Sequence, residues 1–123
     1  MKKILLVEDN EMNRDMLSRR LIRRGFEVAI AVDGRQGVEM ATTEMPHVIL
    51  MDMSLPEIDG WEATRMIKGN PQTSAIPVMG LTAHAMAGDR EKCLAAGCDE
   101  YGSKPVDFAD LIEKIQRLTG ESE

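Results

Sequence analysis

The feature that most constrains this chain is the alternation of short apolar runs with longer amphipathic segments of helical spacing. The short runs, expected to be strands, cover residues 3–8, 27–31, 48–52, 77–81 and 100–103. The amphipathic segments, expected to be helices, cover about residues 10–24, 34–43, 59–68, 89–96 and 108–119. Strict alternation of this kind predicts an α/β fold, with a doubly wound parallel sheet that carries helices on both faces. For five strands we expect the order 2-1-3-4-5.

The size and composition of the chain narrow the class of protein. At 123 residues, with 43% hydrophobic and 29% charged residues, the chain is expected to form one domain with no separate output domain. A net charge of −6 disfavours direct binding of nucleic acid. The longest apolar runs are far too short to cross a membrane, so we expect a cytoplasmic protein that does not enter one.

The two cysteines, Cys93 and Cys98, are separated by four residues, and no histidine stands nearby at zinc-finger spacing. We interpret them as reduced thiols that pack in the interior, in preference to a metal site or a disulfide.

Polar and charged residues fall at the ends of four of the five expected strands. They are Glu8 and Asp9 after the first strand, Asp52 in the third, Thr82 after the fourth, and Ser103 and Lys104 at the end of the fifth. The carboxyl ends of parallel strands meet at one edge of a sheet, so these groups are expected to converge on a single pocket.

The residue types in this expected pocket suit one kind of chemistry. A pair of carboxylates about 4 Å apart repel by on the order of 4 kcal/mol at an effective dielectric constant near 20. A hard divalent cation such as magnesium relieves that repulsion and prefers oxygen ligands. A carboxylate nucleophile, a hydroxyl group at Thr82 and an ammonium group at Lys104 complete the parts that phosphoryl transfer requires.

Each of these residues also has an ordinary structural explanation. Asp9 or Asn10 could cap the first helix, Asp52 and Thr82 could belong to turns, and Lys104 could be a solvated surface residue. The functional interpretation depends on all four strand ends carrying such groups, because coincidence there is improbable.

Four motifs resemble those of response-regulator receiver domains from two-component signalling, which have a flavodoxin-like fold. The motifs are Leu5–Asn10, Leu50–Pro56, Leu81–Met86 and Tyr101–Pro105, and the likeness extends from Lys3 to about Thr119. The chain is similar to stand-alone cell-cycle and polarity regulators and to the receiver modules of hybrid kinases. It departs from the family pattern at Gly80 and Gly102, where larger residues are usual.

The resemblance implies a role for each site residue. Asp52 would be the phosphoacceptor, and the ligands of Mg²⁺, or of Mn²⁺ as a substitute, would be Glu8, Asp9, Asp52 and the backbone carbonyl of Ser54. Lys104 would contact the phosphoryl group, and its bond to Pro105 would be cis. Thr82 and Tyr101 would form the switch pair, while Ser54 and His84 would tune hydrolysis. For His84, a place on a surface loop without function is an equally good interpretation.

The resemblance also implies partners. A histidine kinase or a histidine phosphotransfer protein would donate the phosphoryl group, and the output would be binding to a downstream protein. We expect a monomer or weak dimer that catalyses its own phosphorylation and slow dephosphorylation without ordinary turnover. In the family the first helix docks the donor, and residues 14–24 hold five arginines against one aspartate. A solvated helix face is the commoner explanation for such a run.

Three rival functions remain open at this point. An aspartyl-phosphate phosphatase typically carries a second acid two residues after its nucleophile, where this chain has Ser54. A flavin or nucleotide carrier needs glycines or hydroxyl groups after the first strand, but residues 8–11 are mostly acidic. A scaffold that acts without phosphorylation is the third rival, although no expected site residue is missing.

Overall fold

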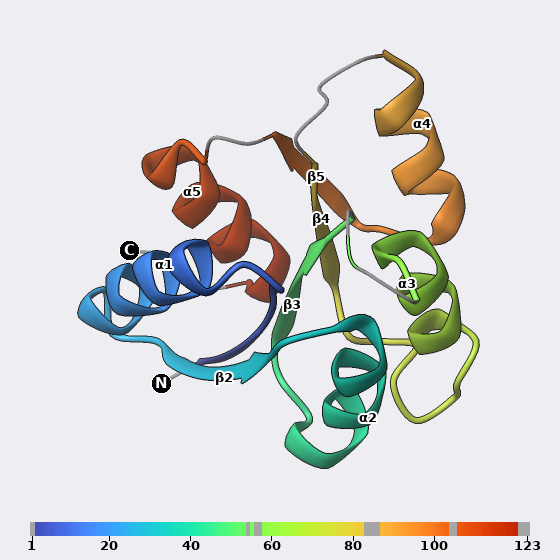
Figure 1. Ribbon diagram of the computed structural model, residues 1–123, viewed down its shortest axis with the longest axis horizontal. Coiled ribbons are helices and arrows are strands. Elements are labelled where there is room, and N and C mark those ends of the chain that lie inside the picture. The colour runs from blue at the N-terminus through green and yellow to red at the C-terminus, as the bar shows by residue number, and fades with distance from the viewer. Residues whose placement is uncertain (1, 54, 56–57, 83–86, 104–105, 121–123) are drawn as a thin grey trace.

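The computed structural model describes residues 2–53, 55, 58–82, 87–103 and 106–120, in which five strands alternate with five helices (Figure 1). In chain order the elements are β1 (Lys3–Val7), α1 (Glu11–Arg23), β2 (Glu27–Ala31), α2 (Gly34–Glu44), β3 (Val48–Asp52), α3 (Gly60–Lys68), β4 (Val78–Thr82), α4 (Ala87–Ala96), β5 (Glu100–Ser103) and α5 (Phe108–Thr119). The expected α/β architecture is confirmed.

The five strands form one parallel sheet in the order β2-β1-β3-β4-β5, as expected. Asp52 at the end of β3 lies opposite Leu81 in β4, and Thr82 lies opposite Ser103 in β5. The carboxyl ends of β1, β3, β4 and β5 are therefore neighbours along one edge of the sheet.

Helices cover both faces of the sheet: α1 and α5 lie on one face, and α2, α3 and α4 lie on the other (Figure 1). Side chains of β1 and β3 alternate between the two resulting cores. Leu6 and Leu50 pack toward α1 and α5, whereas Val7 and Met51 join the core beneath α2 to α4. Because both faces of these strands are buried, their sequences are continuous apolar runs and do not alternate between apolar and polar residues.

Aspartate and asparagine side chains cap four of the helices. Asn10, Asp33, Asp59 and Asp107 each accept a hydrogen bond from the backbone N–H three residues later. Because Asn10 is the cap of α1, the capping role considered for Asp9 belongs to its neighbour.

The element boundaries differ from the sequence expectations by one or two residues. β1 ends at Val7, so Glu8 follows the strand, and β4 is shifted by one residue to include Thr82. α2 continues to Glu44 and ends at Met45, which adopts a left-handed conformation with φ 44°.

No helix in the described part of the chain combines the length and apolar character needed to cross a bilayer. The cytoplasmic location expected from the sequence stays a prediction.

Candidate functional site

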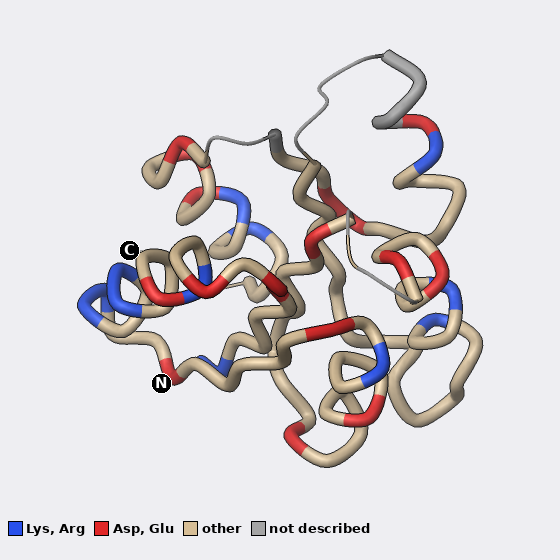
Figure 2. Tube along the Cα trace, in the orientation of Figure 1, with Lys and Arg blue, Asp and Glu red and all other residues tan. Residues whose placement is uncertain are grey.

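Three carboxylates meet at the carboxyl edge of the sheet. Glu8 and Asp9, directly after β1, and Asp52, at the end of β3, each offer a carboxylate oxygen, and these oxygens all lie within 4.8 Å of one another. Glu8 and Asp52 are buried, with 1% and 3% of their surfaces exposed, whereas Asp9 is exposed. In Figure 2 the trace is red where β1 leads into α1 and where β3 ends. The convergence expected from the strand ends is confirmed for these three residues.

Hydrogen bonds hold the loop that presents Glu8 and Asp9. The backbone N–H of Glu8 donates to the carbonyl of Ala31 at 3.1 Å, and the backbone N–H of Asn10 donates to Glu8 Oε2 at 3.2 Å. From α1, Arg14 Nη1 donates to the backbone carbonyls of Glu8 and Asp9, both at 3.2 Å. Arg14 thus orients the acidic loop through its backbone.

Gly60, the first residue of α3, brings that helix against the carboxyl end of β3. A β-carbon at Gly60 would collide with the backbone oxygen of Asp52 and would lie 2.6 Å from the α-carbon of Met53. The sequence indicated a helix start here, but the contact with β3 is tertiary and leaves no signal in local spacing. Gly60 is a positioning residue that the sequence analysis missed.

We expect the substitution Gly60→Ala to destabilise the protein by about 1–3 kcal/mol, because the added methyl group forces α3 away from β3. Urea denaturation would measure this change. The matched control is Gly69→Ala at the other end of α3, where the nearest atom to a β-carbon is Arg65 O at 3.1 Å. Equal and small effects of the two substitutions would contradict the close approach at Gly60.

The two residues of the expected switch pair lie on neighbouring strands. Thr82 ends β4, is 2% exposed, and stands one residue beyond Leu81, the residue paired with Asp52. Tyr101 in β5 is partly buried and packs against the core beneath α2, α3 and α4. The fold therefore places Thr82 beside the end of β3 and Tyr101 on the adjacent strand.

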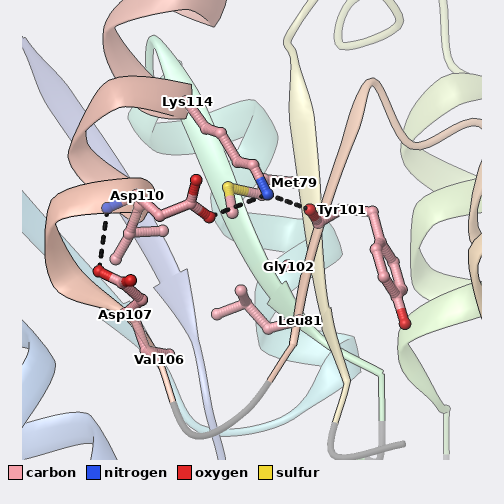
Figure 3. Close-up of a pocket in the computed structure, with 9 residues that line it drawn as sticks. Met79, Leu81, Tyr101, Gly102, Val106, Asp107, Asp110 and Lys114 are labelled. Carbon is pink, nitrogen blue, oxygen red and sulfur yellow. Dashed lines mark hydrogen bonds and ion pairs between the residues drawn. The ribbon is translucent and has the colours of Figure 1, made fainter. Parts of the chain in front are cut away.

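The departure from the family pattern at Gly102 coincides with a cavity of about 140 Å³ between β5 and α5. Figure 3 shows this cavity, with Met79 and Leu81 on its wall and the Tyr101 ring pointing away from it. Lys114 closes one side, since its Nζ donates to the backbone oxygen of Tyr101 at 2.9 Å. A β-carbon at Gly102 would lie 2.8 Å from Met79 Cε and 3.1 Å from Leu81 Cδ2, so these two side chains fill the space beside the glycine, while Tyr101 packs against the core on the other face.

Four of the expected site residues lie outside the described part of the chain. They are Ser54, His84, Lys104 and Pro105. The backbone of Ser103 belongs to β5, opposite Thr82.

The donor set of the acidic cluster fits magnesium. It consists of three carboxylate oxygens close enough to share one ion, and two of the three residues are buried. Like charges at this separation are unfavourable without a cation, and hard divalent cations prefer oxygen ligands. The residues present would therefore hold Mg²⁺.

Comparison with known families agrees with this geometry. The family model described as "Response regulator receiver domain" matches residues 4–116. The chain belongs to the response regulator receiver domain family. A receiver domain is a phosphorylation switch, and the cluster of Glu8, Asp9 and Asp52 is consistent with a magnesium-binding phosphoacceptor site.

Relatives of this receiver domain cover almost its whole length. The polar-differentiation response regulator DivK of Brucella anthropi is 36% identical over 121 residues, which are 98% of each chain. The receiver domain of a sensor histidine kinase from Pseudomonas aeruginosa, solved with magnesium coordinated in its active-site cleft, is 41% identical with a TM-score of 0.90, and covers 98% of each chain.

A second similar structure contains a bound phosphotransfer protein. In it, a Saccharomyces cerevisiae histidine phosphotransfer signalling protein is in complex with the receiver domain of its downstream response regulator. This receiver domain is 28% identical to the chain with a TM-score of 0.90, and the match covers 97% of this chain and 89% of that one.

Proposed function

We propose that Asp52 accepts a phosphoryl group from a phosphohistidine of a partner kinase or phosphotransfer protein, in a reaction that requires magnesium. The observation that carries this proposal is the convergence of buried Asp52 with Glu8 and Asp9 within 4.8 Å. An acid at the end of a buried strand, beside two further acids, has the surroundings of a metal-assisted nucleophile.

In the proposed reaction an oxygen of the Asp52 carboxylate attacks phosphorus. The new O–P bond forms as the P–N bond to the donor imidazole breaks. The leaving nitrogen keeps the bonding electron pair, and the ring takes up a proton from solvent to leave as neutral imidazole. The product is an acyl phosphate on Asp52. Water would later attack the phosphorus of this acyl phosphate, which restores the Asp52 carboxylate and releases inorganic phosphate.

Glu8, Asp9 and Asp52 would hold the magnesium ion, with the backbone carbonyl of Ser54 as a further ligand. When bound, the ion supplies positive charge that stabilises the negative charge on the transferring phosphoryl oxygens. We infer from the family resemblance that Lys104 contacts the phosphoryl group and that Ser54 and His84 tune its hydrolysis. Mn²⁺, another hard cation, is the expected substitute.

The proposed output is a change of protein-binding surface. The hydroxyl of Thr82 would turn toward the phosphoryl group, and Tyr101 would follow on the adjacent strand. The partly buried position of Tyr101 supports this role, because its ring has room to change burial. The names of the two bacterial relatives, a polar-differentiation response regulator and the receiver domain of a sensor histidine kinase, support a role in cell polarity or in signalling by a histidine kinase.

The proposed docking surface for the phosphodonor is the exposed stripe Met12, Met16, Arg19 and Arg23 of α1. Met12 is 78% and Met16 is 50% exposed, and helical spacing places all four residues on one face. Figure 2 shows the basic residues of α1 in blue. This stripe is a mixed apolar and cationic surface next to the loop that carries Glu8 and Asp9.

Not every arginine of the basic run is available for steering a partner. Arg14 is bound to backbone carbonyls of the site loop, and Arg20 lies over the ring of Phe108, 5.1 Å from its centroid. Arg19 is exposed and pairs with Asp15 at 3.3 Å, a weak surface contact. Arg14 and Arg20 therefore have structural roles, and the basic part of the proposed docking stripe consists of Arg19 and Arg23.

We expect Met16→Glu to slow phosphoryl transfer from a histidine phosphotransfer protein about tenfold, because it places a charge in the apolar part of the docking stripe. Labelling by acetyl phosphate, which needs no docking, should be unchanged. Met66→Glu, at a 43% exposed methionine of α3, is the matched control. Equal slowing by both substitutions, or slowing with acetyl phosphate as well, would contradict docking on α1.

The direct test of the proposed function is the mass of the intact protein after incubation with acetyl phosphate and Mg²⁺. A single phosphoryl adduct that requires Asp52 supports the proposal. A wild-type protein that remains unmodified with magnesium present would overturn it.

A further inference from the structure

Away from the acidic cluster, the two cysteines form a sulfur pair. Cys93 lies near the end of α4 and Cys98 lies in the turn that leads to β5. Both are free thiols buried in the core, as expected from the sequence. Their sulfur atoms are 2.7 Å apart, with the Cys93 thiol donating to Cys98 Sγ.

The backbone turn after α4 creates this contact. Gly97 has φ +110°, its N–H donates to the carbonyl of Leu94 at 3.0 Å, and the N–H of Cys98 donates to the carbonyl of Cys93 at 3.1 Å. This hydrogen-bond pattern is the Schellman motif, in which the side chains at the two positions held by the cysteines commonly touch. The sulfur contact is thus fixed by the way the helix ends.

A glycine in the neighbouring strand provides the space for both sulfur atoms. A β-carbon at Gly80 in β4 would collide with Cys93 Sγ and would lie 3.2 Å from Cys98 Sγ. Gly80 is one of the two positions where the chain departs from the receiver family pattern. The departure is explained by the sulfur pair that packs against it.

We propose that Cys93 and Cys98 form a reversible intramolecular disulfide when the protein is oxidised by a peroxide. Disulfide formation requires backbones held close together and side chains directed at one another. The Schellman turn supplies both conditions before any oxidation takes place. The disulfide would join the end of α4 to the turn before β5.

The two thiols have different parts in the reaction. The hydrogen bond from Cys93 lowers the pKa of Cys98, whereas the bond to Cys98 together with burial raises the pKa of Cys93. Cys98 is 6% exposed and Cys93 is fully buried. Since the thiolate is the nucleophile in thiol oxidation, Cys98 reacts with the peroxide first and Cys93 resolves the product.

The reaction proceeds in two steps. Cys98 Sγ attacks one peroxide oxygen, the O–O bond breaks, and the hydroxide that leaves takes up a proton to become water, giving a sulfenic acid. Cys93 Sγ then attacks Cys98 Sγ, the S–S bond forms, the S–O bond breaks, and a second water leaves with the Cys93 proton. Two thiols lose two hydrogens in total, and hydrogen peroxide is reduced to two waters.

Peptide mass spectrometry of the folded protein after treatment with hydrogen peroxide tests the proposal. Trypsin should release residues 93–114 as one peptide, which contains both cysteines and none of the ten methionines. Methionine oxidation elsewhere in the chain therefore cannot obscure the result. We expect this peptide to lose two hydrogens and to regain them after treatment with dithiothreitol.

Two matched variants assign the order of the steps. In Cys93→Ser the sulfenic acid on Cys98 has no resolving thiol, so dimedone should label it. In Cys98→Ser the remaining thiol, Cys93, is fully buried and out of reach of the peroxide, so labelling should be at least tenfold lower. Trp61 fluorescence, from the only tryptophan in the chain, would verify that both variants are folded.

The proposal is overturned if the wild-type peptide keeps its mass or gains only oxygen atoms. It is also overturned if either single variant loses two hydrogens from this peptide, because the pair would then not be the site. Neither result depends on whether Asp52 is phosphorylated.

Discussion

Asp52→Asn is expected to abolish phosphorylation of this receiver domain. With acetyl phosphate and Mg²⁺ the wild-type protein should gain one phosphoryl group, and the variant should gain none. The amide nitrogen and oxygen of asparagine cannot supply the anionic nucleophile that forms an acyl phosphate. Mass spectrometry of the intact proteins under identical conditions measures the difference.

The matched control for this prediction is Asp110→Asn. Asp110 is an exposed aspartate in the first turn of α5, outside the acidic cluster, and it undergoes the same change of one oxygen to an amide. The Asp110→Asn protein should be phosphorylated to the same extent as the wild type. If Asp52→Asn gained as much phosphoryl group as the wild type, the phosphoacceptor would have to be a residue other than Asp52.

The order of the strands and helices, and the bounds of several of them, follow from local sequence patterns. β2 and β3 have the predicted bounds, Glu27–Ala31 and Val48–Asp52. Turn-forming residues stand close to these strands in the sequence: Gly25 and Asp33 on either side of β2, and Pro46 before β3. The meeting of Glu8, Asp9 and Asp52 also follows, since strand order and a common parallel direction fix which strand ends are neighbours.

The remaining features depend on contacts between distant segments. Spacing alone could not decide whether Asp9 or Asn10 caps α1, because both are adequate caps and the choice is made by how the loop packs. The role of Gly60 depends on how closely α3 approaches β3, and the role of Gly80 depends on two sulfur atoms from another part of the chain. The spacing of residues along the sequence does not predict how closely these segments approach one another.

Glu8→Gln is expected to have opposite effects on stability and on magnesium binding. Glu8 is buried within 4.8 Å of two other carboxylates, where each like-charge pair costs at least about 3.5 kcal/mol at an effective dielectric constant near 20. Removing its charge should therefore raise the melting temperature of the magnesium-free protein. It should also weaken Mg²⁺ binding roughly tenfold or more, which corresponds to about 1.4 kcal/mol.

Thermal melting with and without Mg²⁺ measures both effects in one experiment. A ligand at about 100 times its Kd stabilises the folded state by about 2.7 kcal/mol, so magnesium should raise the wild-type melting temperature and raise that of Glu8→Gln much less. Trp61 directly follows Gly60, which packs against the backbone of Asp52, so Trp61 fluorescence should report magnesium binding independently of the melting curves.

Glu11→Gln is the matched control, because it removes the same charge three residues further along, from an exposed position outside the cluster. It should bind magnesium as the wild type does. If Glu8→Gln instead melted at a lower temperature without magnesium and kept wild-type affinity, the buried carboxylate would be held by hydrogen bonds within the fold. Charge repulsion would then not be what prepares this edge of the sheet for a cation.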